Sequence, residues 1–173
     1  MNYILTVIGF LLLIAGNQLR WLYVAGTAFV LADIIITQYN LVVGEMNRLM
    51  VSFTSSVIGV MMFYYFNRII TIVVSFLTGG YVLLFLPRLL GWHMSWSPTL
   101  IFVIGGSIAA GLTIVWSTFA IILLTTLGGT TLVLQNFSFG NISNQAMALV
   151  LIVVGLTAQF ILQQYSRPDE DWT

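Results

Sequence analysis

The most informative stretch of the chain is residues 50–86, an apolar run with one formal charge, Arg68, near its middle. An α-helix needs about 20 apolar residues to cross the roughly 30 Å hydrocarbon core of a bilayer. The run is too long for one crossing and long enough for two. Its polar pair Asn67-Arg68 is the one place where the chain can leave hydrocarbon. The pattern therefore predicts a membrane helical hairpin that turns at Asn67-Arg68.

The other apolar stretches follow the same pattern. The second long block, residues 99–135, carries no charge and also requires a break, for which Trp116-Ser117-Thr118 is the best candidate. Pro87-Arg88 is expected to end the preceding helix, because proline cannot continue the hydrogen-bond ladder. The predicted fold is an all-α polytopic membrane helical bundle of about seven transmembrane helices, built as three helical hairpins plus one. Its single domain covers residues 1–165, and a short acidic tail covers 166–173. Outside the block at residues 99–135, helices are expected at residues 3–18, 21–39, 50–66, 69–86 and 146–165.

A spacing of 50 residues relates these stretches. Gly9 is followed eight residues later by Asn17, and Gly59 is followed eight residues later by Asn67. Hairpins that repeat in one topology would be parallel repeats, unlike the inverted repeats of many secondary transporters. A further step of 50 aligns Ile58 with Ile108, Phe66 with Trp116, Leu77 with Leu127, and Gly79 with Gly129.

Composition places the chain in lipid. Of its 173 residues, 60% are hydrophobic and 6% are charged, whereas soluble domains carry about 25% charged residues. A mean hydropathy of +1.05 agrees with an integral membrane protein that is covered by the bilayer. The zero net charge argues against a nucleic-acid partner. The absence of cysteine excludes disulfides, thiolate metal sites and a lipoprotein anchor.

The five arginines set the expected orientation. With seven spans, Arg20, Arg68 and Arg167 fall on one side of the membrane, and Arg48 and Arg88 fall on the other. Cytoplasmic loops carry an excess of basic residues, so the sequence favours an outside N-terminus and a cytoplasmic C-terminus. No basic residue precedes the first apolar run, which predicts that residues 3–19 form a retained helix and not a cleaved signal peptide.

Asp33 is the strongest candidate for a functional side chain, because no other acid falls inside an expected helix. A carboxylate at such depth costs at least about 2.5–3.5 kcal/mol on insertion scales, so it usually faces a partner or water. Three interpretations remain open. In the first, Asp33 is protonated, hydrogen-bonded to a neighbouring hydroxyl, or close enough to the interface to be hydrated. In the second, it pairs with an arginine of another subunit. In the third, it forms a cation or proton site.

Small residues four apart form the second signal. Gly105 and Ala109, Gly106 and Ala110, and Ser107 and Gly111 have this spacing, as do Ser55 and Gly59, and Ser75 and Gly79. Such residues let helix backbones approach closely, which favours packing in lipid. The alternative is an unwound, ion-lined segment at Gly79-Gly80 or Gly128-Gly129, but no charged or carboxamide ligand accompanies these glycines. Helix packing is the preferred interpretation.

A family resemblance rests on glycine and hydrophobic spacing. Its residues are Gly9, Gly16, Arg20 and Gly26 in the first hairpin, the double glycine within 76–80, the segment IGGSIAAG at 104–111, and LGG at 127–129. In these motifs the chain resembles the transmembrane protein 198-like family, also described as seven-transmembrane superfamily member 3-like. The resemblance implies a seven-helix membrane domain without known catalysis; a eukaryotic member is associated with Wnt receptor signalling as a membrane scaffold. The chain departs from the family at Ala32-Asp33, where a small apolar pair is expected.

The sequence gives little support to catalysis or to cofactor binding. His93 is the one histidine, and it lies beside Trp92 and Trp96 in an expected loop, which is typical of an interfacial aromatic belt. No acid is close in sequence to orient it towards Ser95 or Ser97. We therefore expect no enzyme activity, no cofactor and no metal site.

Two functions remain. The first is a non-catalytic scaffold or accessory subunit of a larger membrane complex, with the bilayer and other membrane subunits, or copies of itself, as partners. The second is a small-solute or proton channel or transporter organised around Asp33. It requires more polar residues facing a common axis than the sequence offers, because Asn and Gln lie mostly at helix ends and threonines are the main exceptions. Their hydroxyls could instead bond to their own backbone. These threonines are Thr113, Thr118, Thr125, Thr126, Thr130 and Thr131.

Overall fold

A computed structural model describes residues 2–16, 20–39, 44–91, 96–136 and 143–165. Trp92, His93 and the acidic tail at 166–173 lie outside the described residues. Within the described ranges every regular element is an α-helix, as the hydrophobic pattern predicts. These helices are α1 (Asn2–Ala15), α2 (Arg20–Tyr39), α3 (Glu45–Leu89), α4 (Pro98–Val115), α5 (Ser117–Asn136) and α6 (Asn144–Tyr165).

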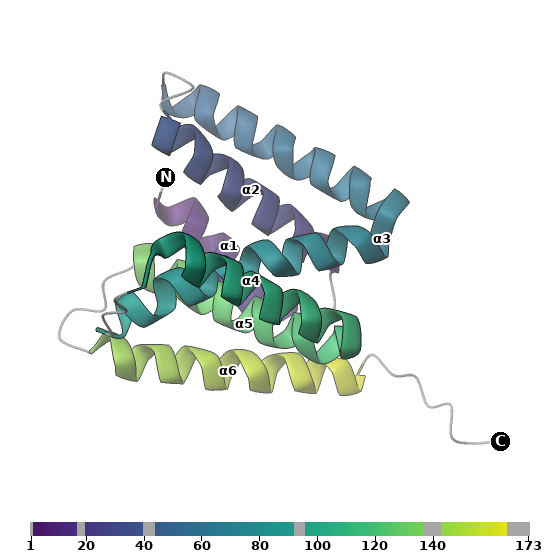
Figure 1. The fold of residues 1–173 in the computed structure, drawn as a ribbon, viewed down its shortest axis with the longest axis vertical. Coiled ribbons are helices and arrows are strands. Elements are labelled where there is room, and N and C mark those ends of the chain that lie inside the picture. Colours follow the sequence, from purple (N-terminus) through teal and green to yellow (C-terminus); the bar gives the residue numbers. More distant parts are fainter. Residues whose placement is uncertain (1, 17–19, 40–43, 92–95, 137–142, 166–173) are drawn as a thin grey trace.

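The predicted hairpin at residues 50–86 lies within α3, which consists of two helical segments joined by a sharp corner. α3 has 45 residues and would be about 67 Å long if it were straight, more than twice the thickness of a hydrocarbon core. Phe66 has the non-helical angles φ −129° and ψ 42°, one residue before the expected turn. Two arms leave this corner in different directions (Figure 1). We call residues 45–65 the first arm and residues 67–89 the second arm.

Six helices are assigned in the described ranges, and α3 joins two helical segments across the non-helical Phe66, so the expected count of seven is not confirmed. Five of the six are long and apolar enough to cross a bilayer. The sixth, α1, contains a shorter apolar helical segment, Tyr3–Ile14. The expectation that Pro87 ends the helix is wrong. α3 continues to Leu89 and ends where Gly91 takes a positive φ of 78°, because proline near a helix end removes only one hydrogen bond.

The second expected turn lies at Trp116. Trp116 separates α4 from α5 with φ −133° and ψ 69°, close to the angles of Phe66. α4 begins with Pro98, and the Ser97 Oγ accepts a hydrogen bond of 3.3 Å from the backbone N–H of Leu100. This cap satisfies one of the N–H groups that a helix start leaves unpaired. In Figure 1 the corner of α3 and the junction of α4 with α5 lie towards the same side of the bundle.

Three close helix pairs build the bundle. α2 packs on the first arm of α3, the second arm of α3 packs on α4, and α5 packs on α1. α6 covers α1 and α5 at one edge of the bundle (Figure 1). α5 is therefore enclosed on most sides, and Ile121, Thr126 and Val133 have no exposed surface.

Candidate functional site

The closest helix contact joins the second arm of α3 to α4 through the predicted small residues. A Cβ atom added to Gly79 would overlap the Cβ of Ala109 and would lie 2.7 Å from the carbonyl oxygen of Gly105. A Cβ atom on Gly106 would lie 2.7 Å from the ring of Phe76. No side chain fits between these backbones, which is the arrangement that small residues permit between helices in lipid.

Other predicted small residues lie at the two remaining pairs. A Cβ atom on Gly129 of α5 would lie 2.6 Å from the carbonyl oxygen of Gly9 on α1. A Cβ atom on Gly59 would lie 3.1 Å from the Cβ of Ala28, where α2 meets the first arm of α3. Gly128 is less tightly enclosed, since an added Cβ would lie 3.2 Å from Thr78.

The rest of the predicted set on α4 has looser surroundings. Gly111 is exposed, and a Cβ atom added to it would meet nothing within 4 Å. Ala110 is half-buried. One face of α4, with Gly105 and Ala109, therefore makes the close contact, and Gly111 lies outside it.

Asp33 forms an ion pair with Arg48 of the same chain. The Arg48 Nε lies 2.9 Å from the Asp33 Oδ1, and Asp33 is 6% exposed. Arg48 reaches Asp33 because α3 begins at Glu45, five residues before the expected helix start, so that Arg48 lies in its first turn. Asp33 thus has an internal partner, which links α2 to the first arm of α3.

Three of the six predicted threonines bond to their own helix backbones, whereas the buried Thr130 Oγ1 has no hydrogen-bond partner among the described residues. Thr113 Oγ1 donates to the carbonyl of Ala109 at 2.8 Å, Thr125 Oγ1 to that of Ile121 at 2.7 Å, and Thr131 Oγ1 to that of Leu127 at 2.8 Å. Hydroxyls engaged in this way provide little polar surface for a solute.

Gln159 of α6 is a polar contact that the sequence analysis missed. Its side chain is 2% exposed, and its Nε2 donates to the carbonyls of Leu12 and Leu13 at 3.2 and 3.0 Å. Its amide also bonds with the hydroxyls of Thr125 and Thr126. Helix ends leave carbonyls without intrahelical partners, and α1 ends at Ala15. The Gln159 side chain therefore donates hydrogen bonds to carbonyls at the end of α1 and links α6 to α1 and α5.

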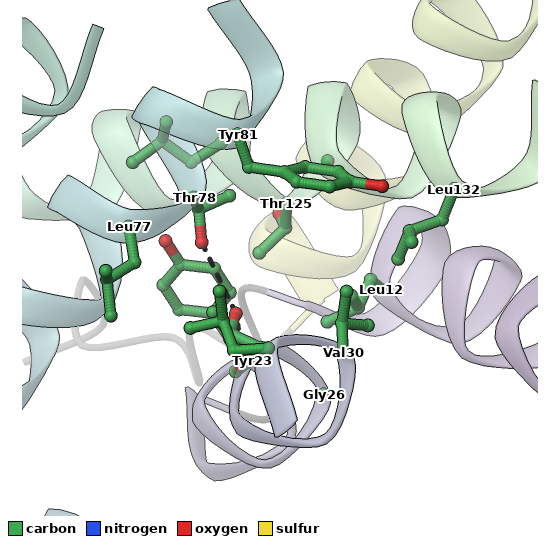
Figure 2. Close-up of a pocket in the computed structure, with 13 residues that line it drawn as sticks. Leu12, Tyr23, Gly26, Val30, Leu77, Thr78, Tyr81, Thr125 and Leu132 are labelled. Atoms are coloured by element: carbon green, nitrogen blue, oxygen red, sulfur yellow. Dashed lines mark hydrogen bonds between the residues drawn. The ribbon is translucent and has the colours of Figure 1, made fainter. Parts of the chain in front are cut away.

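A small cavity lies where α2, the second arm of α3 and α5 meet. Its volume is about 30 Å³, and the side chains around it point towards one another (Figure 2). Most of the lining is apolar, including Leu12 and Leu132, and the Thr27 and Thr78 hydroxyl oxygens lie 3.3 Å apart at its side. The cavity has room for about one water molecule and is too small for an organic ligand.

A larger cavity, of about 310 Å³, lies at the end of the bundle where the hairpins turn. Its lining is mixed polar and apolar, and it combines residues from α2, α3, α4 and α5. We call it the tip cavity. It is lined by Arg20, Asn67, Arg68, Thr71, Ile72, Thr113, Ile114, Ser117 and Ile121.

The fold and these contacts define a multi-pass, all-helical integral membrane protein. Comparison with models of protein families, with curated proteins and with solved structures finds no match for the chain. The resemblance to the transmembrane protein 198-like family therefore stays a prediction.

Proposed function

We propose that the protein is a non-catalytic scaffold or accessory subunit of a larger membrane complex. The observation that carries the proposal is that three polar side-chain contacts, two of them in the interior, link helices of the same chain. Asp33 pairs with Arg48, Gln159 joins α6 to α1 and α5, and the Tyr81 hydroxyl donates to the Gln135 Oε1 at 2.7 Å between α3 and α5. Polar groups used in this way stabilise a fixed bundle, which would then act through its outer, apolar helix faces.

We also propose that the bundle consists of three hairpins of one kind plus α6, with seven spans when the two arms of α3 are counted separately. Phe66 and Trp116 are 50 residues apart and have similar backbone angles. The second arm of each hairpin packs on the first arm of the next, and α5 of the third packs on α1 of the first. Such a closed set of contacts supports a rigid structural body.

A second candidate function is a small-solute or proton channel or transporter organised around Asp33. It is favoured by one observation: apart from the ion pair, the buried Asp33 Oδ1 receives no hydrogen bond from the described residues. A buried carboxylate balanced by one arginine is the kind of group that proton relays use.

Asp33→Asn separates the two functions. The substitution leaves Arg48 without its counter-charge, so we expect the free energy of unfolding in detergent to fall by about 1–3 kcal/mol. This loss is smaller than for a fully buried pair, because Arg48 is one-quarter exposed. The double variant Asp33→Asn/Arg48→Gln should recover part of the loss. In liposomes, we expect no proton flux above background for the wild type or the variant. Flux by the wild type that a folded Asp33→Asn variant lacks would overturn the scaffold proposal.

The proposed orientation places the N-terminus outside and the C-terminus in the cytoplasm. Arg20 and Arg68 line one cavity and therefore lie at one end of the bundle, which would be the cytoplasmic end. The chain contains no cysteine, so single-cysteine variants report position without background. We expect a membrane-impermeant maleimide to label Ser97→Cys in intact cells and to label Ser117→Cys only after permeabilisation. The reverse pattern would show that the orientation is inverted.

A further inference from the structure

The tip cavity gathers positive charge from two hairpins. Arg20 is the first residue of α2, and Arg68 lies at the start of the second arm of α3; both side chains are exposed and line the cavity. No carboxylate of the described residues lines it. Asp33 lies about 20 Å along α2 from Arg20 and is paired with Arg48, and Glu45 lies at the far end of the first arm of α3. Two guanidinium groups at one cavity repel each other unless an anion lies between them.

The surrounding backbone adds to this positive potential. α2 begins at Arg20, the second arm of α3 begins at Asn67 and α5 begins at Ser117, and all three residues line the tip cavity. A helix N-terminus carries partial positive charge and unpaired N–H groups, which favour anions. The Asn67 amide and the Ser117 hydroxyl supply further hydrogen-bond donors at the same place.

We propose that the tip cavity binds a phosphate group between Arg20 and Arg68. Arginine is suited to this group, because its planar fork can donate two parallel hydrogen bonds to phosphate oxygens. A volume of about 310 Å³ accommodates a phosphate with part of a headgroup. The apolar side of the lining, with Ile72 and Ile114, suits the start of an acyl chain. The phosphate belongs to an anionic lipid headgroup or to soluble phosphate, and this inference does not depend on the proposed scaffold function.

The experiment uses the full chain purified in a neutral maltoside detergent. Native mass spectrometry measures retention of phosphatidylglycerol against phosphatidylcholine, and calorimetry measures the binding of inorganic phosphate. The test variant is Arg20→Gln/Arg68→Gln. The matched control is Arg88→Gln, which removes one exposed arginine at the other end of the second arm of α3. Detergent unfolding curves verify that each variant is folded, and the single variants Arg20→Gln and Arg68→Gln replace the double variant if it is not.

We expect the wild type and Arg88→Gln to retain phosphatidylglycerol in preference to phosphatidylcholine. Arg20→Gln/Arg68→Gln should bind phosphatidylglycerol at least about tenfold more weakly, since each charge-assisted hydrogen bond contributes a factor of that size. Saturable binding of inorganic phosphate that the same variant loses would identify soluble phosphate as the ligand. The proposal is overturned if neither probe binds specifically, or if Arg88→Gln weakens binding as much as the cavity variants do.

Discussion

Replacing Gly79 with leucine is expected to prevent the second arm of α3 from packing on α4. Even a Cβ atom at this position overlaps Ala109 and lies 2.7 Å from the Gly105 carbonyl oxygen, so the two backbones must separate. Both obstacles belong to a helix backbone or to its first side-chain atom, and neither can rotate away. Overpacking that the surroundings cannot relieve costs about 1–3 kcal/mol and occasionally more, and we expect this variant to exceed about 3 kcal/mol.

Gly111→Leu is the matched control for Gly79→Leu. It lies on α4, where an added Cβ meets nothing within 4 Å, and leucine is a better helix former than glycine. Unfolding by sodium dodecyl sulfate titration in mixed micelles measures both variants. We expect a large loss of unfolding free energy for Gly79→Leu and little change for Gly111→Leu. Equal stability of the two variants would mean that α3 and α4 do not pack through Gly79.

Gln159→Leu is expected to loosen α6 from the bundle. The substitution keeps a similar side-chain volume and removes the amide that bonds to the Leu12 and Leu13 carbonyls and to the threonine hydroxyls of α5. Hydrogen bonds between membrane helices contribute about 0.6 kcal/mol on average, and up to about 1.7 kcal/mol. With the Leu13 carbonyl left buried at the end of α1, the expected loss of unfolding free energy is about 2–3 kcal/mol.

The control for Gln159→Leu is Gln164→Leu, which removes an exposed carboxamide near the end of the same helix. The same titration should detect little change for this control. Limited proteolysis should then show earlier release of α6 from Gln159→Leu than from the wild type. A fully stable Gln159→Leu protein would contradict the role assigned to this amide.

The turns of the bundle were predictable from sequence because polar groups are scarce. Asn67-Arg68 is the one polar step in its apolar run, and the corner lies one residue away at Phe66. At Trp116 an uncharged block too long for one crossing had to break, and the break falls at the first residue of the expected turn. The spacing of small residues indicated that helices approach closely. It did not indicate which helices meet, because the spacing within one helix does not specify the helix that packs against it.

Two polar contacts were missed for different physical reasons. Arg48 precedes the expected helix start at residue 50, so the sequence pattern does not predict its pairing with Asp33. The helix begins five residues earlier, with Glu45 favourably placed in its first turn. Gln159 precedes Gln163 and Gln164, so it resembled part of a polar helix end. Its role depends on α1 ending at Ala15 beside it, and only the tertiary structure reveals that position.

The most direct test of the central claim is gentle detergent extraction from the native membrane, followed by native gel separation and mass spectrometry of the band that contains this chain. A bundle whose polar contacts at Asp33, Tyr81 and Gln159 link its own helices is expected to act through its surface. The account therefore predicts that the chain migrates with another membrane protein in a fixed ratio. Migration of the chain alone, under conditions that preserve other membrane complexes of the same extract, would contradict it.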